Sequence, residues 1–245
     1  MAFVSSVVGV QNSAFLAQTS RRPCPGRSSA SRRVAPVATL AADKDSTAPS
    51  GLQYLSPEAQ QRASESGMKF EKIKVAKDGS AMWTEIYELA EMLRKGESTW
   101  EEIGGDDIDI RFKWAGMFHR RKATPGRFMV RLKVPNGIIS SDQMRLLATS
   151  VDKYGKDGCL DITTRQNMQL RGVVLEDAPE LFDKLYENGL TSFMSGMDNV
   201  RNIVGSPIAG IDPHELIDTR QLCTDINDML TDNRKGNPEF TNLPR

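Results

Sequence analysis

Residues 127–134 alternate between apolar side chains and polar or cationic ones, which is the pattern of a β-strand with two different faces. One face carries Phe128, Val130, Leu132 and Val134, and the other carries Arg127, Met129, Arg131 and Lys133. A second alternating run at residues 168–174 places Arg171 on its polar side. A sheet built from such strands must cover its apolar face with another layer of the protein.

Two helices are predicted between and after these strands, and they supply that layer. A capping box at Ser140 and Gln143 begins the first helix, whose apolar stripe ends before Gly155. The second starts near Pro179 and ends at Gly189. With a short strand at residues 159–162, the order is strand, helix, strand, strand, helix. This order favours an α+β fold in which helices cover one face of the sheet.

The opposite face of the sheet is predicted to be cationic. Arg127, Arg131, Lys133 and Arg171 project from it, and arginine remains charged and binds carboxylates bidentately even when partly desolvated. The loop 163–167 adds hydroxyl, amide and guanidinium donors, and Arg201 lies between Asn199 and Asn202 in a second polar loop. We expect an acidic ligand on this face. A solvated surface without a ligand is the alternative.

Composition narrows the class of protein. The first 42 residues contain five arginines and no acidic residue, which is typical of an organelle transit peptide; a disordered basic arm is the alternative. The rest of the chain has 27 basic and 32 acidic residues, which disfavours a general nucleic-acid binder. No apolar run is long enough for a membrane-spanning helix.

The few cysteines and histidines do not form a metal-binding pattern. Cys159 and Cys223 lie far apart, Cys24 is in the leader, and the sequence has no C-x-x-C motif and only two histidines. Neither a zinc finger nor a local iron–sulfur motif can be drawn from these residues.

Five ordered motifs together resemble the amino-terminal half of the ferredoxin-dependent nitrite reductases. They are residues 127–137, 154–158, 163–167, 196–202 and 242–245, within a similarity that covers about residues 80–245. The assimilatory sulfite reductases belong to the same family and share the T-x-R-Q and N-x-x-R-N themes. The resemblance is specific because the motifs occur in the same order.

The resemblance implies a domain order. A plastid transit peptide at residues 1–42 and an extended arm or linker at 43–80 precede a helical and irregular segment at 81–126. A ferredoxin-like half-domain follows at 127–195, and residues 196–245 begin a siroheme-binding domain that is truncated. The implied location is the chloroplast stroma, and family members are typically monomeric.

The resemblance also implies the chemistry. Family members reduce nitrite to ammonium with six electrons from reduced ferredoxin, at a siroheme coupled to a 4Fe-4S cluster. Arg131 and Arg201 match the arginines that face the substrate. The siroheme contacts are matched by Thr163, Thr164, Arg165 and Gln169. The cationic strand face and the second polar loop add the further cofactor-binding candidates Arg127, Lys133, Arg171 and Asn202.

The sequence also departs from the family pattern. The family continues after the position of Arg245 with an active-site lysine, and its four cluster cysteines lie in the carboxy-terminal half, where neither Cys159 nor Cys223 matches them. We therefore expect no metal ligand in this chain and no catalysis by the chain alone. Two alternatives are a fragment of a ferredoxin-sulfite reductase and a non-catalytic fragment that binds an anion or ferredoxin, the latter through the basic stretch at residues 111–122.

Overall fold

The computed structural model of the chain describes residues 51–119, 124–155 and 159–244. The chain divides into two units, residues 1–33 and residues 34–245, and every described residue belongs to the second unit. The predicted transit peptide and the first part of the predicted arm lie outside the described residues.

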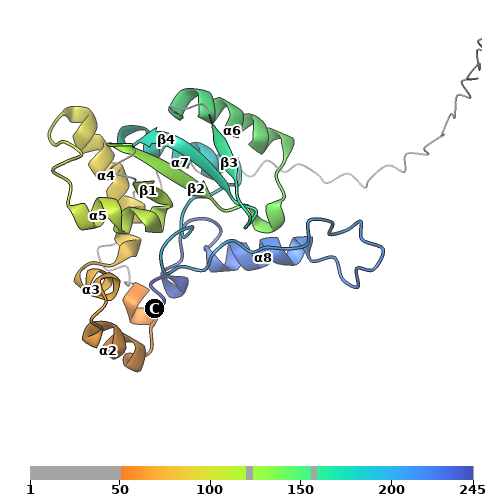
Figure 1. The fold of residues 1–245 in the computed structure, drawn as a ribbon, viewed down its shortest axis with the longest axis horizontal. Coiled ribbons are helices and arrows are strands. Elements are labelled where there is room, and N and C mark those ends of the chain that lie inside the picture. Colours follow the sequence, from red (N-terminus) through yellow and green to blue (C-terminus); the bar gives the residue numbers. More distant parts are fainter. Residues whose placement is uncertain (1–50, 120–123, 156–158, 245) are drawn as a thin grey trace, which may run out of the picture. The chain divides into compact units, whose positions relative to one another are not determined.

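A four-stranded antiparallel sheet forms the centre of the described part (Figure 1). Its strands are β1 (Met117–His119), β2 (Arg127–Leu132), β3 (Leu160–Ile162) and β4 (Met168–Val174), in the spatial order β1-β2-β4-β3. The sequence predicted β2, β3 and β4. It did not predict β1, because this strand has only three residues and lies in a stretch without alternation.

A β-bulge shifts the register between β2 and β4. Phe128 pairs with Val173 and Met129 pairs with Arg171, so Gly172 between them has no partner in β2. Gly172 has a φ of 91°, a conformation that glycine adopts without steric cost. The bulge keeps both Leu170 and Val173 in the core, although they are three residues apart.

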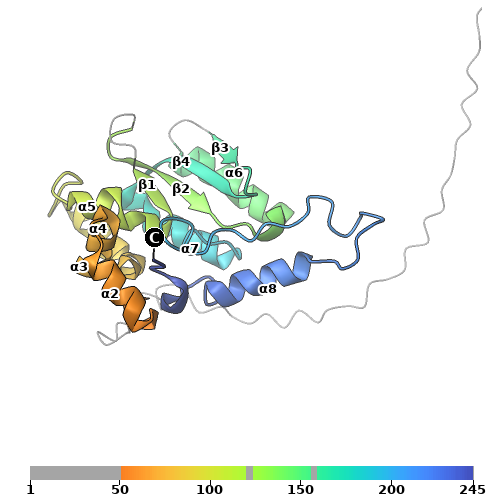
Figure 2. The same cartoon turned by 60° about the horizontal axis from the view of Figure 1, so that its bottom comes forward.

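Three helices cover the apolar face of the sheet: α4 (Met82–Lys95), α6 (Ser141–Tyr154) and α7 (Ala178–Glu187). Helix α6 packs on β4, and α7 packs against both α6 and α4 (Figure 2). Their inward residues join those of β2 and β4 in one core, which includes Ile86, Phe128, Val130, Leu132, Leu147, Leu170, Leu181 and Leu185. The mixed helix-and-sheet fold predicted from the sequence is confirmed.

The capping box of α6 is present as predicted. The Ser140 hydroxyl accepts from the Gln143 amide at 3.2 Å, and the Gln143 side chain accepts from the Ser140 amide at 2.9 Å. We expect Ser140→Ala to lower the free energy of unfolding by about 1 kcal/mol, because one orphan amide of the first turn loses its partner. Urea unfolding followed by circular dichroism measures this. Ser141→Ala, one residue on and exposed, is the matched control and should change little.

Part of the segment expected to be an extended arm is helical. It forms α2 (Pro57–Glu65) and α3 (Lys69–Ala76), which pack against each other. The expectation of an extended conformation was wrong for these residues. Both helices are short and rich in charged residues, so their sequence carries no clear apolar stripe. Their stability comes from tertiary contacts instead.

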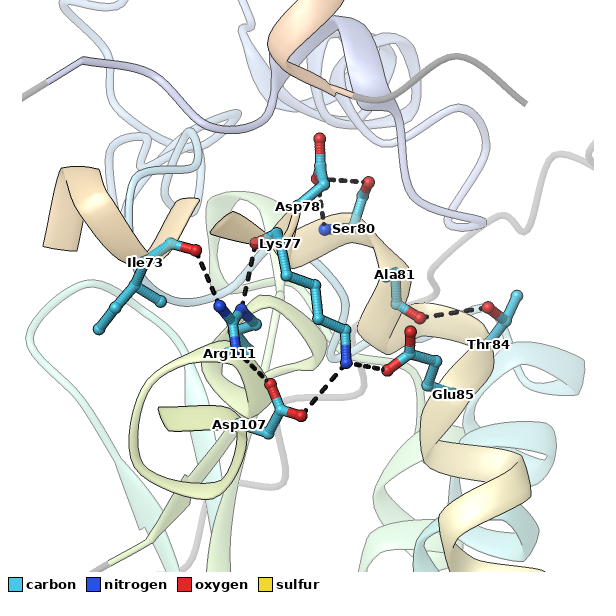
Figure 3. Close-up of polar contacts among 9 residues, drawn as sticks. All are labelled: Ile73, Lys77, Asp78, Ser80, Ala81, Thr84, Glu85, Asp107 and Arg111. Atoms are coloured by element: carbon cyan, nitrogen blue, oxygen red, sulfur yellow. Dashed lines mark hydrogen bonds and ion pairs between the residues drawn. The ribbon is translucent and has the colours of Figure 1, made fainter. Parts of the chain in front are cut away.

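Arg111 ties the end of α3 to the next part of the chain (Figure 3). Its guanidinium donates to the carbonyl oxygens of Ile73 at 2.9 Å and Lys77 at 3.1 Å, and it pairs with Asp107 at 2.5 Å. Asp107 belongs to α5 (Gly105–Asp109), and Arg111 begins the 3-10 helix η3 (Arg111–Ala115). The Ile73 carbonyl oxygen also accepts from the Lys77 amide at 3.1 Å, so Arg111 adds a second donor there and fixes the end of α3 to α5 and η3.

The last part of the described chain consists of loops and one helix, α8 (Arg220–Leu230), which packs against the turn η4 (Pro135–Gly137). The residues just before α8 form turns and loops, and Leu216 among them is 97% exposed. The remaining short 3-10 helices are η1 (Gly51–Tyr54), η2 (Gly79–Ala81), η5 (Leu175–Asp177) and η6 (Pro238–Phe240). Among the described residues, no helix has the length and apolar character to cross a membrane.

Candidate functional site

Four basic side chains from three segments gather beside β2, and we call them the cationic cluster: Arg131, Lys133, Arg165 and Arg201. Arg131 and Arg201 donate to the same acceptor, the carbonyl oxygen of Ser195, at 3.3 and 3.1 Å. Burial, followed by the nearby charges of Arg201 and Arg165, lowers the pKa of Arg131 below its usual range. The like charges repel, so this arrangement favours an anion as its ligand.

Strand β1 supports Arg131 from one side. The guanidinium carbon of Arg131 lies 4.3 Å from the centre of the Phe118 ring, within the range of a cation–π interaction. Gly116, just before β1, has a φ of 81°, and a Cβ there would lie 2.3 Å from the Ser192 carbonyl oxygen. Only glycine therefore allows the chain to approach the loop that contains Ser195.

The loop 195–203 lies over part of the face of β2 that the sequence predicted to be cationic. Lys133 is consequently only 1% exposed, and its ammonium donates to the Val200 carbonyl oxygen at 3.1 Å. Burial, together with the charge of Arg201, lowers the pKa of Lys133 to about 8. No carboxylate within the described part of the chain pairs with Arg131 or Lys133.

The amide of Asn202 holds two segments of this site together. Its Oδ1 accepts from the Val134 amide at 3.0 Å, and its Nδ2 donates to the carbonyl oxygens of Val134 at 2.8 Å and Arg165 at 2.9 Å. Both polar atoms of the Asn202 side chain are thus hydrogen-bonded to backbone groups. This residue, predicted from the sequence to bind a cofactor, links the backbone of Arg165 to the end of β2.

The loop 163–167 presents polar groups to the outside of the site. Thr164 and Arg165 are exposed, and the hydroxyl of the half-buried Thr163 accepts from the Asn167 amide at 3.2 Å. Gln169 lies on β4 directly opposite Arg131 in the sheet. Gln166 anchors the loop by exchanging two hydrogen bonds with the backbone of Gly205.

Two of the predicted cationic residues do not join the cluster. Arg127 donates to the Gly172 carbonyl oxygen at 2.7 Å, and Arg171 pairs with the Asp161 carboxylate at 2.5 Å. Both lie at the bulge, while Arg131 lies toward the other end of β2. Their positive charges are already engaged locally, so the structure separates them from Arg131.

Sequence reasoning did not identify Phe118 or Ser195 as parts of the site. Phe118 could not be found because β1 itself was not predicted. Ser195 contributes its carbonyl oxygen, a group that every residue has, and its hydroxyl, which donates to the Arg131 carbonyl oxygen at 2.9 Å. Its place at the start of the glycine-containing loop was the one signal in the sequence.

The described residues include no group of three or more His, Cys, Asp and Glu side chains that could hold a metal ion. Cys159 is half-buried and Cys223 is buried on α8, and neither forms a disulfide.

Lys133→Met is expected to stabilise the chain by about 2 kcal/mol at pH 7. A pKa lowered from 10.5 to about 8 corresponds to a cost of about 3 kcal/mol for keeping Lys133 charged, offset by about 1 kcal/mol for its hydrogen bond. Between pH 8 and 10.5 the unfolded chain binds a proton that the folded chain has released, so the stability of the unmodified chain rises with pH. The advantage of the variant should therefore shrink at alkaline pH.

Urea unfolding at pH 7 and pH 10 tests this expectation. Lys72→Met removes an exposed lysine from α3 and is the matched control, for which we expect a change within about 0.5 kcal/mol. A Lys133→Met variant that is strongly destabilised at pH 7 would contradict the cost assigned to this buried charge.

Two family models match the chain in consecutive regions. The nitrite/sulfite reductase ferredoxin-like half domain matches residues 119–188, and the nitrite and sulphite reductase 4Fe-4S domain matches residues 196–245. The first region contains β2, α6, β3, β4 and α7. The second begins at the loop that carries Arg201, so the cationic cluster draws residues from both regions.

Curated relatives match a longer part of the chain than the two family models do. The chain is 55% identical over 177 residues to the chloroplastic ferredoxin–nitrite reductase of Spinacia oleracea, an alignment that covers 71% of this chain and 30% of the relative. It is 52% identical over 177 residues to the ferredoxin–nitrite reductase of Leptolyngbya laminosa, covering 72% of this chain and 33% of that protein. The matched region thus spans about a third of the length of these relatives.

The fold is also similar to that of solved structures. The NirA protein of Mycobacterium tuberculosis superimposes with a TM-score of 0.53 at 24% sequence identity, covering 64% of this chain and 30% of that one. At this identity the similarity concerns the fold.

Proposed function

We propose that the chain, a member of the nitrite and sulfite reductase family by its matches over residues 119–188 and 196–245, forms the N-terminal part of a ferredoxin-dependent nitrite reductase. The proposed reaction is the six-electron reduction of nitrite to ammonium. The observation that carries this proposal is the cationic cluster, in which the guanidinium groups of Arg131 and Arg201 converge on one carbonyl group, so that two like charges lie close together and favour a small anion beside them.

The residues of the site fit siroheme, the cofactor that the family implies. Siroheme carries several carboxylates, and the cationic cluster offers guanidinium and ammonium groups. Two of these side chains, Arg131 and Lys133, have no carboxylate partner within the described part of the chain. We propose that Arg165, Thr163, Thr164 and Gln169 hold the cofactor, with Lys133 contributing charge. When bound, siroheme coupled to a 4Fe-4S cluster would pass electrons from the electron donor to the substrate.

Arg127 and Arg171 are weaker candidates for binding the cofactor, because each already bonds to a partner near the bulge, Arg127 to the Gly172 carbonyl oxygen and Arg171 to the Asp161 carboxylate. For the 4Fe-4S cluster, the described residues include no group of three or more His, Cys, Asp and Glu side chains that could hold a metal ion.

We propose that residues 127–195 form the half-domain and that residues 196–245 begin the siroheme-binding domain.

In the proposed mechanism, Arg131 and Arg201 bind the anion and orient it. Their positive charges stabilise the negative charge that develops on oxygen as the N–O bonds break. The Phe118 ring and the Ser195 carbonyl fix the two guanidinium groups before the anion arrives, so little reorganisation is needed during the reaction. Lys133 raises the local positive potential from its buried position.

Nitrite is favoured over sulfite as the substrate by the names of the relatives from plants and cyanobacteria. We propose reduced ferredoxin as the electron donor and, by analogy with the plant relatives, the chloroplast as the location. The test uses the native protein that contains this sequence, with reduced ferredoxin and either nitrite or sulfite. Ammonium formation from nitrite with six electrons consumed is expected; preferential reduction of sulfite would identify the alternative enzyme.

A further inference from the structure

We propose that Lys74 is a positioning residue, which holds the loop 195–201 in the place where Arg131 and Arg201 share the Ser195 carbonyl. The inference extends the site to helix α3, which lies outside the region matched by the family models. It rests on the proposed function only for the identity of the anion that the two arginines hold.

Lys74 is almost completely buried, at 1% exposure, and makes three polar contacts from the end of its side chain. Its Nζ lies 2.7 Å from a carboxylate oxygen of Glu71 on the same helix. It lies 3.1 Å from a carboxylate oxygen of Asp198 and 3.0 Å from the carbonyl oxygen of Leu243. Two of these three contacts therefore reach segments more than 120 residues away in the sequence.

The two distant segments are also joined directly. The Leu243 amide donates to the Asp198 carbonyl oxygen at 2.9 Å. The Lys74 ammonium therefore contacts two segments that are already hydrogen-bonded to each other. Asn199 extends the connection, because its Nδ2 donates to the Gly196 carbonyl oxygen at 2.6 Å and its Oδ1 accepts from the Thr241 hydroxyl. Lys74 thus completes a polar network that begins one residue after Ser195.

The loop needs such an external support. Met194 and Met197, on either side of Ser195, have φ angles of 58° and 51°, which are unfavourable for residues with a side chain. Met197 packs in a small apolar cluster with Ile73 of α3 and with Trp114. Helix α3 therefore contacts the loop through adjacent residues, Ile73 by packing and Lys74 by charge.

Replacing Lys74 with methionine removes the positive charge between two buried carboxylates, whose mutual repulsion is then no longer offset by this ammonium group. We expect the loop to shift and to carry Arg201 away from Lys133. The Nζ resonance of Lys133, followed by nitrogen NMR of the 245-residue chain during a pH titration, reports this movement. Its pKa is expected to rise from about 8 by at least one unit toward 10.5 in Lys74→Met.

Asp198→Asn provides a second test, because it removes the negative charge through which the loop pairs with Lys74 and keeps the size of the side chain. It should raise the pKa of Lys133 in the same direction, and it decides the question alone if Lys74→Met does not fold. Lys77→Met is the matched control. Lys77 also lies at the end of α3, but it pairs with Glu85 at 2.5 Å and Asp107 at 3.2 Å, neither of which belongs to the loop (Figure 3).

An unchanged Lys133 titration in a folded Lys74→Met or Asp198→Asn chain would overturn the proposal, and so would an equal shift in Lys77→Met. The titration needs neither siroheme nor nitrite. If the pKa of Lys133 shifts as expected but the native protein does not reduce nitrite, the proposed function is rejected and the role of Lys74 stands. Nitrite reduction with an unmoved Lys133 would reject only the role of Lys74.

Discussion

Replacing Arg131 or Arg201 with glutamate should lower nitrite turnover by the native protein roughly a hundredfold to a thousandfold. Each substitution puts a negative charge where the proposed mechanism places the anion. It also removes one of the two groups that converge on the Ser195 carbonyl. The siroheme absorbance should persist, because other residues are proposed to hold the cofactor.

Arg127→Gln is the matched control for this pair. Arg127 lies on the same strand and has the same charge, but it donates to the Gly172 carbonyl oxygen at the bulge. We expect its turnover to stay within a few-fold of the unmodified protein. Turnover that is unchanged in both Arg131→Glu and Arg201→Glu would remove these arginines from the mechanism.

Trp114→Ala should lower the free energy of unfolding by about 3–5 kcal/mol, the typical loss for a large aromatic side chain in a core. Trp114 is completely buried, and its ring lies so close to Gly79 that a Cβ there would be 2.2 Å from it. Its neighbours Ile73 and Met197 belong to α3 and to the loop of the candidate site. The substitution therefore weakens the attachment of α3 as well as the core.

Urea unfolding followed by far-ultraviolet circular dichroism measures this loss. Met92→Ala on α4 is the control, since Met92 is 39% exposed and its truncation should change the stability by no more than about 0.5 kcal/mol. Amide hydrogen exchange in α3 should become faster in Trp114→Ala. A loss below about 1 kcal/mol would show that this apolar contact does not hold α3 in place.

The central sheet and its helices could be predicted because their sequence periodicity is local. Strand β2 alternates, and α6 has a capping box followed by an apolar stripe. Helix α3 could not be predicted in the same way, because its buried residues Glu71 and Lys74 are charged. They are buried because distant residues pair with them, which no local pattern indicates.

The candidate site, like the fold, could be predicted from the sequence only in part. The motif resemblance identified Arg131, Arg165 and Arg201, which the structure brings together. Alternation also placed Arg127 and Arg171 on the same face, but position along a strand separates them from the cluster. The burial of Lys133 depends on the loop 195–203, which folds back over β2 from more than 60 residues away in the sequence.

The most direct test of the account is the affinity of the native protein for nitrite, measured by titrating the siroheme absorbance with and without Arg201→Glu. This measurement separates binding of the anion from its reduction. If Arg201 holds the anion, the substitution should weaken nitrite binding at least tenfold while Arg127→Gln leaves it unchanged. Equal affinity in the unmodified protein and in Arg201→Glu would contradict the assignment of the cationic cluster as the anion site.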